Sequence, residues 1–413
     1  VLAASRQRLG LPDECTFRLG PLALPDPTVA SSELAPALAL FLDRARRARP
    51  GFELAEGDRD AAVSVVRRLD GVPLAIELAA GRLSALGVAD LRDRLDRALE
   101  LLRGDRTASD ARHQTLRATL AWSYDLLPAD RQRLVRHMAV FPDGVDLAAA
   151  ERIAADVGVT DDPAAALGHL VDASMLDPDF DGGPRYRMLD TLRTFGLQEL
   201  DANDERDEAE RRLLRWAEQL VAWVDATLHT ADEPLADGRL RRELSNLRAA
   251  WVLAMRRDAL DAAISIVVSL DDAAQWRDLP EVWSWARALA EHPGLVDHPR
   301  RAAALATASD FAWLQGDLAM ATELATSAVA CAHDEDGSAR ALIALSVAEL
   351  SHGNFPAAAE MALLAAELTA RPEHCRMVAA LATGYAGDLD AAAAVNAMVV
   401  PPGGITQRAE WEY

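Results

Sequence analysis

Apolar side chains recur at helical spacing through the first part of the chain. Residues 34–45 place them three or four positions apart, directly after Ser31 and Ser32, which are suited to capping a helix. The same spacing predicts helices over residues 59–69, 74–86 and 90–102. Gly71 and Pro73 lie between two of these helices, where a glycine ends one helix and a proline is tolerated at the start of the next. The pattern therefore predicts a small helical domain over residues 21–112.

The pattern changes over residues 113–205. Helical spacing predicts helices over residues 115–127, 129–140, 147–156 and 164–172. Two short extended segments, Met175–Asp177 and Arg185–Met188, then flank a turn rich in aspartate and glycine, which predicts a β-hairpin. A final helix is predicted over residues 192–200. Helices followed by a hairpin are the order of elements in a winged-helix domain.

From residue 201 onward every strong period is helical. An acidic stretch, residues 201–210, marks the expected boundary. Beyond it, similar passages surround Gly316, Gly353 and Gly387, and each is followed by an alanine-rich helix. The glycines are 37 and 34 residues apart, which matches the period of tetratricopeptide repeats. Residues 206–413 are therefore predicted to form tetratricopeptide-like (TPR-like) helical repeats, and the passages near residues 257–258 and 277–278 are more degenerate copies.

The composition restricts the chemistry of the chain. It contains 84 alanines and no lysine among its 413 residues, so all 43 basic residues are arginines. No lysine of this chain can clamp a phosphate, form a Schiff base or act as a general base. The net charge is −22, and residues 113–200 hold 8 arginines against 14 acidic residues. Nucleic-acid binding needs clustered positive charge, so we expect no direct nucleic-acid contact by this chain.

Cysteine content and hydropathy indicate the compartment. The three cysteines, Cys15, Cys331 and Cys375, do not form a disulfide framework and suit a reducing compartment. No apolar run has the length of a membrane helix, and no signal segment opens the chain, so we expect a soluble, cytoplasmic protein without membrane contact. The sequence begins with Val1 rather than methionine, which leads us to expect a fragment of a longer protein.

Few residue groups suggest a metal or a reaction. Cys331 with His333, and His374 with Cys375, offer soft ligands, but their spacing differs from that of zinc sites, and we predict no metal site. Seven tryptophans fall within residues 216–313; they could line a binding groove, but we interpret them as filling gaps between helices. Glycine-x-serine-x-glycine, zinc-protease and dinucleotide-binding motifs are absent, so no nucleophile and base are paired by sequence.

Several separated passages resemble one class of proteins when taken in order. They are residues 1–6 (VLAASR), 70–80 (DGVPLAIELAA), 113–127 (HQTLRATLAWSYDLL), 185–193 (RYRMLDTLR) and 243–251 (ELSNLRAAW). The chain resembles the STAND class (NB-ARC-like signal-transduction ATPases), in particular bacterial transcriptional regulators of the AfsR/SARP-like or LuxR-like kind. The resemblance implies that residues 1–20 are a remnant of the nucleotide-binding α/β domain, followed by the helical, winged-helix and repeat domains predicted above.

The resemblance also implies residues that bind ATP or ADP in a full-length relative. Arg6 matches an arginine that reaches the terminal phosphate, and a planar guanidinium suits phosphate oxygens. Gly71 and Pro73 match a motif whose proline packs on adenine. Asp190 ends a passage that reads Met-His-Asp in many relatives; here Leu189 replaces the histidine, and Asp190 could simply cap the next helix.

The phosphate loop of such ATPases is absent from this sequence. That loop, G-x-x-x-x-G-K-[ST], requires a lysine and a magnesium-binding hydroxyl. We therefore expect no ATP hydrolysis and no cofactor bound by this chain alone. The function predicted is a nucleotide-linked switch joined to a repeat region that senses a protein or small-molecule effector. The alternative is a TPR-like interaction scaffold without nucleotide dependence.

Overall fold

The computed structural model describes residues 20–25, 35–94 and 121–399, apart from a few internal positions: 70, 72, 74–75, 77–78, 81–82, 84–85, 122–123, 126, 174, 181–182 and 278. Contacts divide the chain into two compact units, Val1–Ala209 and Glu210–Tyr413. Within the described ranges, no helix has both the length and the apolar character needed to cross a bilayer. The passage at residues 1–6, the capping serines and the helices predicted over 74–86, 90–102 and 115–127 fall wholly or partly outside the described residues.

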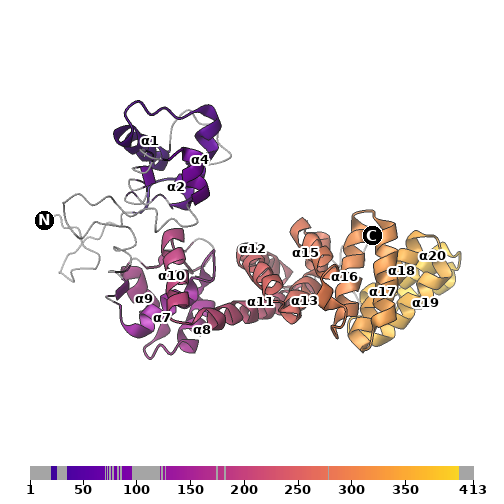
Figure 1. Ribbon diagram of the computed structural model, residues 1–413. Helices are drawn as coiled ribbons and strands as arrows, with labels where there is room; N and C mark the ends of the chain where they lie inside the picture. Colours follow the sequence, from indigo (N-terminus) through magenta and orange to yellow (C-terminus); the bar gives the residue numbers. More distant parts are fainter. Residues whose placement is uncertain are drawn as a thin grey trace. The chain divides into compact units, whose positions relative to one another are not determined.

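Among its described residues, the first unit consists of helices (Figure 1), one 3-10 turn and three short strands. Its elements are α1 (Pro36–Ala48), the 3-10 turn η1 (Glu56–Asp58), α2 (Arg59–Arg68), α4 (Val88–Arg94), α7 (Ala129–Met138), β1 (Val145–Asp146), α8 (Leu147–Asp156), α9 (Pro163–Asp172), β2 (Asp177–Asp179), β3 (Arg185–Arg187) and α10 (Asp190–Ala202).

Helices α1, α2 and α4 pack through the apolar positions that predicted them. In α1, Leu38, Phe41 and Ala45 are buried, and in α2 the pair Val65 and Val66 is fully buried. Helix α1 begins at Pro36, which is tolerated there because the first N–H of a helix has no partner within it. These helices bury one face each, as amphipathic periodicity requires.

In the hairpin-bearing part of the first unit, the helices predicted over 129–140, 147–156, 164–172 and 192–200 and the hairpin are present, and one strand was missed. Strands β2 and β3 pair in antiparallel fashion, with Pro178 opposite Tyr186. The prediction omitted β1, which pairs with the other side of β3, so the sheet order is β1-β3-β2. Two residues are too short a segment to show alternation in the sequence. Arg185 is almost fully buried and donates hydrogen bonds from Nε to Asp143 O and from Nη2 to Gly144 O, which ties the start of β1 to the hairpin.

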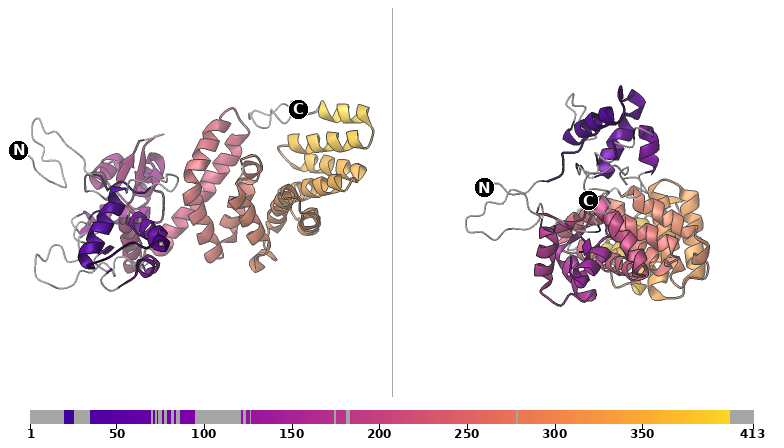
Figure 2. Two further views of the ribbon diagram at one scale, coloured as in Figure 1. Left: turned by 90° about the horizontal axis from the view of Figure 1, so that it is seen from above. Right: turned by 60° about the vertical axis from the view of Figure 1, so that its left-hand side comes forward.

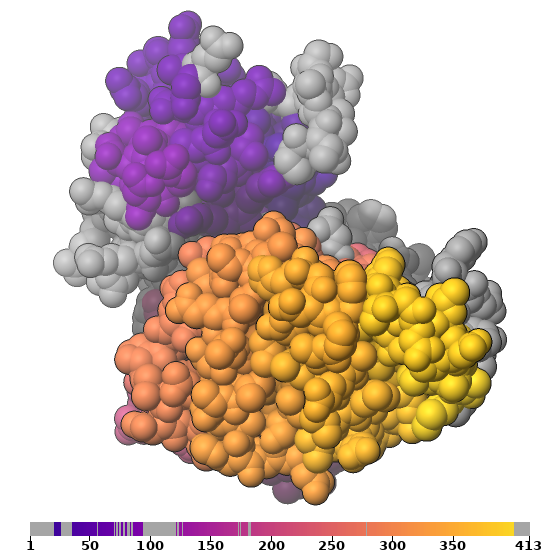
Figure 3. Space-filling model, turned by 90° about the vertical axis from the view of Figure 1, so that its right-hand side faces the viewer, coloured from indigo at the N-terminus to yellow at the C-terminus, as the bar shows by residue number. Residues whose placement is uncertain are grey.

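The second unit consists of helices and one 3-10 turn in the residues that the structure describes. They are α11 (Arg206–Leu228), which starts in the last residues of the first unit, then α12 (Glu233–Arg256), α13 (Leu260–Ser269), α14 (Asp271–Trp276), α15 (Pro280–Ala290), η4 (Pro293–Leu295), α16 (Arg301–Leu314), α17 (Leu318–Cys331), α18 (Glu335–Ser351), α19 (Phe355–Leu368), α20 (Glu373–Tyr385) and α21 (Leu389–Asn396). Successive helices lie side by side as a curved stack (Figure 2), and α16–α21 form one continuous body (Figure 3).

The three passages aligned by sequence form the same turn. Gly316, Gly353 and Gly387 have φ angles of +81°, +82° and +97°, the left-handed region that favours glycine, and each follows the first helix of a pair. The residue after each glycine donates its N–H to a carbonyl in the last turn of that helix, at 2.9–3.3 Å. Asp317 and Asp388 then cap the second helix through Oδ1. The TPR-like helical solenoid predicted from the glycine spacing is confirmed.

Small residues set the distance within each pair. Ser309 and Ser346 are buried at equivalent positions, and their hydroxyls donate to Ala321 O and Ala358 O at 2.8 and 2.7 Å. The acceptor helices bury only alanine on this side, as Ala321, Ala325 and Ala328 in α17 and Ala358, Ala362 and Ala365 in α19. Small side chains at these positions let the two helices of a pair pack closely, which agrees with the high alanine content of the chain.

An earlier repeat forms a similar turn without a glycine, which made it hard to recognise in the sequence. At the degenerate passage 257–258, Asp258 takes the left-handed position with a φ of +52°, and Ala259 N donates to Ala254 O. Aspartate is one of the few residues other than glycine that tolerate this conformation. Three tryptophans of this region, Trp216, Trp251 and Trp285, are buried, and the rings of Trp251 and Trp285 stack 5.4 Å apart. Trp276 and Trp313 differ from the predicted core role because they are 48% and 39% exposed.

Candidate functional site

The residues predicted to bind nucleotide lie in different segments of the chain. Arg6 lies outside the described residues. Gly71 and Pro73 belong to the first helical block, and Asp190 begins α10 in the hairpin-bearing part. Their assignment to nucleotide therefore stays a prediction.

Gly71 has a structural requirement of its own. Its φ is +68°, and Leu22 N donates to Gly71 O at 2.9 Å. A Cβ at this position would lie 2.2 Å from Leu22 O, so no other residue fits without a backbone shift. Pro73 is exposed in this structure. The glycine thus fixes the approach of residues 20–25 to this block, whatever else the passage binds.

Asp190 does not cap α10. The capping position is Leu189, whose backbone is extended and whose side chain accepts no hydrogen bond. Asp190 is exposed in the first turn instead, where a carboxylate interacts favourably with the positive end of the helix dipole. The capping role expected for Asp190 is therefore wrong by one residue.

A cluster of charged residues fixes the last part of the first unit. Arg136 of α7 donates from Nε and Nη2 to the two oxygens of Glu205, each at 2.8 Å. Arg133 Nε and His137 Nε2 lie 3.3 and 3.4 Å from the same carboxylate, and Arg136 also donates to the Tyr124 hydroxyl. We call these five residues the Glu205 cluster. Glu205 lies directly before α11, so the acidic stretch 201–210 contributes a carboxylate that packs onto α7.

The Glu205 cluster favours the charged state of its carboxylate. Burial alone would raise the pKa of Glu205, but the hydrogen bonds and positive charge of Arg136 more than offset burial and lower that pKa. Burial also raises the pKa of Tyr124. The cluster therefore holds one fully paired negative charge among several positive groups.

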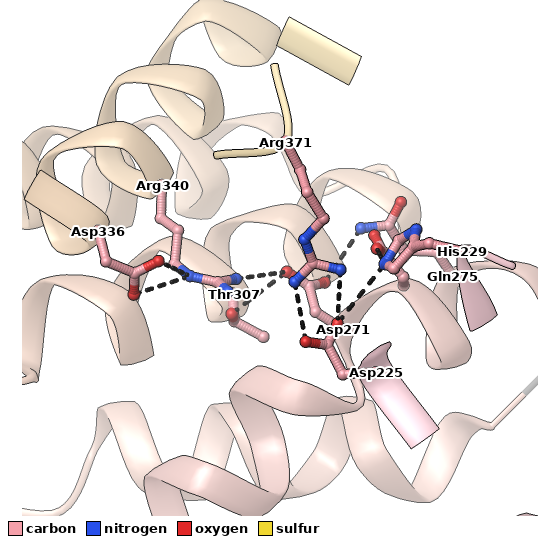
Figure 4. Close-up of polar contacts among 9 residues, drawn as sticks. Asp225, His229, Asp271, Gln275, Thr307, Asp336, Arg340 and Arg371 are labelled. Atoms are coloured by element: carbon pink, nitrogen blue, oxygen red, sulfur yellow. Dashed lines mark hydrogen bonds and ion pairs between the residues drawn. The ribbon is translucent and has the colours of Figure 1, made fainter. Parts of the chain in front are cut away.

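A second polar cluster lies in the repeat region and has the opposite balance of charge (Figure 4). We call it the Asp271 cluster, after the carboxylate at the start of α14. Gln275 Nε2 and the Thr307 hydroxyl donate to Asp271 at 3.0 and 3.3 Å, and Arg340 Nη1 lies 3.9 Å away. The other members come from α11, α14, α16, α18 and the segment before α20: Asp225, His229, Asp272, Asp310, Asp336 and Arg371.

Carboxylates in this cluster repel one another. Burial raises the pKa of Asp271 to about 7, and the negative charge of Asp272 adds to the increase. Burial and the charge of Asp271 also raise the pKa of Asp310 well above its usual value. Asp225 and Asp272 behave differently: burial would raise their pKa values, but hydrogen bonds and nearby positive charge, from His229 at both residues and also from Arg371 at Asp225, together outweigh burial and lower them. The cluster thus contains two carboxyl groups that bind a proton more readily than usual, Asp271 and Asp310, and two that stay charged more readily, Asp225 and Asp272.

The repeat alignment contained a signal for this cluster that the sequence analysis missed. Aligned on the glycines, Asp310 occupies the position of Val347 and Leu381 in the next two repeats. A carboxylate at a position that is otherwise apolar indicates a local function or a special partner. Arg340 and His374 are likewise equivalent to each other, and both face the cluster: Arg340 lowers the pKa of Asp271 and His374 that of Asp272.

One trio in the cluster has the spacing of a metal site. Among the described residues, only Asp225, His229 and Asp272 bring three ligand atoms within 4.8 Å of one another. Both oxygens of Asp225, however, already accept hydrogen bonds from Arg371, at 3.1 and 2.8 Å. A guanidinium therefore supplies the positive charge that a cation would bring. The pairs Cys331 with His333 and His374 with Cys375, considered in the sequence, do not contribute to this trio.

A shallow cavity of about 440 Å³ lies elsewhere in the repeat region, beside α11 and the turn between α12 and α13. Charged side chains of both signs line it, including Arg211, Arg215, Glu218, Asp258 and Asp261. Burial raises the pKa of Glu218, and the charge of Asp261 adds to this. Because the lining carries both signs, its chemistry does not select one class of ligand.

Comparison with known proteins supports a bacterial regulator. The chain is 34% identical over 376 residues to a candidate HTH-type transcriptional regulator of Mycobacterium tuberculosis, covering 87% of this chain and 41% of that protein. It is also 34% identical over 223 residues to the regulatory protein AfsR of Streptomyces coelicolor, covering 49% of this chain and 20% of AfsR. No protein-family profile matches the chain. The predicted resemblance to AfsR-like regulators is confirmed, and the chain spans less than half the length of either relative.

One solved structure has an arrangement that partly matches this chain. It is a STAND protein with a tetratricopeptide repeat sensor from Pyrococcus horikoshii, 13% identical, covering 87% of this chain and 58% of that one. Its TM-score is 0.27, too low to support any conclusion about this chain.

Proposed function

We propose that this chain, a relative of AfsR-like bacterial transcriptional regulators, supplies the switching and signal-receiving parts of such a regulator in the cytoplasm. In this proposal, residues 113–205 form a winged-helix domain that acts as a switch rather than as a DNA reader. The helical repeats receive the signal by binding a protein or small-molecule effector. The state of a bound nucleotide would be coupled to that contact.

One observation carries the proposal: the similarity to the mycobacterial regulator extends over 376 residues and so includes the helical block, the hairpin-bearing block and the repeats together. A shared repeat region alone would fit many unrelated scaffolds. The Glu205 cluster adds support because it ties α7 of the hairpin-bearing block to the residue before α11. A rearrangement of that block would therefore act directly on the start of α11.

The nucleotide part of the proposal depends on residues that this chain does not contain. Arg6, Gly71, Pro73 and Asp190 match family positions, but the phosphate loop needs a lysine, and the sequence has none. Phosphoryl transfer is catalysed mainly by positioned positive charge around the phosphates. We therefore expect ATP or ADP to bind only when this chain is part of the longer protein, and we expect this chain alone to have no ATPase activity.

The test compares this chain with the full-length gene product. ATP and ADP are titrated by isothermal calorimetry against both, and ATPase activity is measured for both. We expect binding to the full-length protein, weakened at least tenfold by Arg6→Ala, and no binding or turnover by this chain. An exposed arginine of α1, Arg47, provides the control variant Arg47→Ala.

Two outcomes would contradict the proposal. Turnover by this chain alone would show catalytic chemistry that the sequence does not predict. Failure of the full-length protein to bind either nucleotide would favour the alternative, a TPR-like interaction scaffold without nucleotide dependence.

A further inference from the structure

The contact between Arg371 and Asp225 joins two distant parts of the repeat region. Arg371 lies between α19 and α20, and Asp225 lies in α11, 146 residues earlier. The guanidinium donates from Nη1 to Oδ1 at 3.1 Å and from Nη2 to Oδ2 at 2.8 Å, a paired geometry visible in Figure 4. Paired guanidinium–carboxylate contacts fix orientation as well as distance.

The surroundings of this ion pair hold it in place on both sides. The backbone N–H of Arg371 donates to the Thr369 hydroxyl at 3.2 Å, and Pro372 directly after it restricts the chain. Asp225 lies in the long helix α11 with its side chain 25% exposed, and His229 one turn later lies 3.6 Å from it. The carboxylate is thus partly removed from water, and its attraction to Arg371 is less screened than on an open surface.

The position of this ion pair in the helical stack is what gives it a mechanical effect. In a solenoid each repeat contacts only its neighbours, so the curvature is the sum of small rotations between successive pairs. Thermal variation in each rotation therefore accumulates along the stack. A direct contact between α11 and the segment before α20 fixes the distance between these two parts of the stack. It therefore limits the total curvature that the intervening repeats can adopt.

We propose that Arg371 and Asp225 form a latch that holds the repeat region in its closed curvature, and that breaking this ion pair opens the stack. The latch requires neither nucleotide nor the assignment of the chain as a regulator. Its effect is to give the region two arrangements, closed and open, whose balance shifts with this partly exposed ion pair.

Several other charged groups face the latch and set its dependence on pH and salt. They are His229 on α11, Asp271 and Asp272 on α14, Arg340 on α18 and His374 on α20. The pKa of Asp225 is lowered by His229 and Arg371, so the carboxylate stays charged at neutral pH. Acid that protonates Asp225 should open the latch, and high salt should weaken it because Arg371 is 47% exposed.

The test measures the distance across the latch with spin labels. Cys15, Cys331 and Cys375 are first replaced by serine or alanine, and labels are attached through Ala222→Cys on α11 and Glu367→Cys on α19, both at exposed positions. Double electron–electron resonance then compares the parent with Arg371→Gln, Asp225→Asn and the charge-reversed pair Asp225→Arg with Arg371→Asp. Arg287→Gln is the matched control, because the exposed Arg287 pairs with Glu291, four residues later at the C-terminal end of α15, and this ion pair joins no two separate helices.

We expect one narrow, short distance in the parent and the control. Either single change at the latch should shift the distribution to longer distances and at least double its width, and the reversed pair should restore most of the short population. In the parent, 1 M NaCl should produce the same shift, which tests the latch without any substitution. Circular dichroism verifies that each variant keeps its helix content.

The proposal is overturned if Arg371→Gln gives the same distribution as Arg287→Gln with helix content unchanged. It is equally overturned if high salt leaves the parent distribution unaltered, because that result does not depend on the folding of any variant.

Discussion

The two polar clusters of this chain place charge among helices in opposite ways. In the Glu205 cluster one carboxylate is surrounded by Arg133, Arg136 and His137, so its negative charge is over-compensated. In the Asp271 cluster burial raises the pKa values of Asp271 and Asp310, and the neighbouring carboxylates, which outnumber the positive groups, raise them further. The first arrangement makes a rigid joint, because every charge has a partner. The second leaves repulsion between carboxylates, which opposes folding. Protonation, salt or a bound partner can reduce this repulsion.

The hairpin-bearing part and the repeat pairs α16–α21 also differ in how their cores are packed. The hairpin-bearing part relies on large buried side chains such as Phe141 and Phe195 and on long-range arginine contacts. The repeat pairs α16–α21 bury mainly alanine and two hydrogen-bonded serines. Damage to one central residue should therefore be severe in the first region and graded in the second. Four measurements test this comparison.

The largest effect is expected at Glu205. Glu205→Ala leaves Arg136 and His137 buried without their carboxylate, and removal of one partner of a buried ion pair costs about 3–5 kcal/mol. Hydrogen exchange of the α7 amides should show the corresponding loss of protection. The control is Glu208→Ala, whose carboxylate is 38% exposed and pairs with the partly exposed Arg133; it should cost at most about 1 kcal/mol. Equal losses in both variants would contradict the joint role of Glu205.

The next effect is expected within a repeat pair. Ala362 is fully buried in α19, and Ala362→Leu forces additional volume between closely packed helices, at a cost of about 1–3 kcal/mol. Urea denaturation followed by circular dichroism measures the loss. Leu364→Ala on the same helix changes a side chain that is 46% exposed and should stay within about 0.5 kcal/mol of the parent. A tolerated leucine at position 362 would show that alanine does not set the spacing.

The Asp271 cluster predicts a dependence of stability on pH. The pKa of Asp271 is raised in the folded state to about 7, above its ordinary value, so the folded chain binds more protons between these two values. Stability from this group is present at low pH and is lost as pH rises through 7, with a slope of at most about 1.4 kcal/mol per pH unit per proton. Asp271→Asn should flatten this slope and stabilise the chain above pH 7.

Tryptophan fluorescence in urea between pH 5 and 8 measures this dependence, because most tryptophans lie in the second unit. Glu205 supplies the contrast: its pKa is lowered, so its contribution is present near neutral pH and is lost only as acid protonates it. An unchanged slope in Asp271→Asn would remove the basis for the comparison.

The smallest effect is expected at the turn glycines. Gly353→Ala places a Cβ in the left-handed conformation and should cost about 1 kcal/mol. Gly384→Ala lies inside α20, where the new Cβ would meet Ala392 at an ordinary 3.8 Å, and it should be neutral or stabilising by up to about 1 kcal/mol. Thermal denaturation distinguishes the two signs. Destabilisation by both changes would show that packing, rather than backbone conformation, controls these turns.

Much of the fold could be predicted because it depends on local patterns. Helix α8 has the predicted bounds, 147–156, and the repeat glycines adopt the turn that their spacing indicated. Strand β1 was missed because a two-residue strand has no pattern of its own; it exists only where β3 accepts it. Asp190 was expected to cap α10, but it is the first residue of that helix and Leu189 is the cap. The residue type alone does not fix where a helix starts, because the start depends on the backbone conformation.

The sequence by itself determined the helical class, the repeat period and the absence of lysine chemistry, since each follows from residue types and their spacing along the chain. Only the tertiary structure decided which charges meet. Arg371 and Asp225 are 146 residues apart, and Glu205 finds Arg136 across 69 residues. The attraction between two charges and the cost of burying them depend on the distance between them and on their surroundings. Both are set by how the helices pack, and not by the order of residues along the chain.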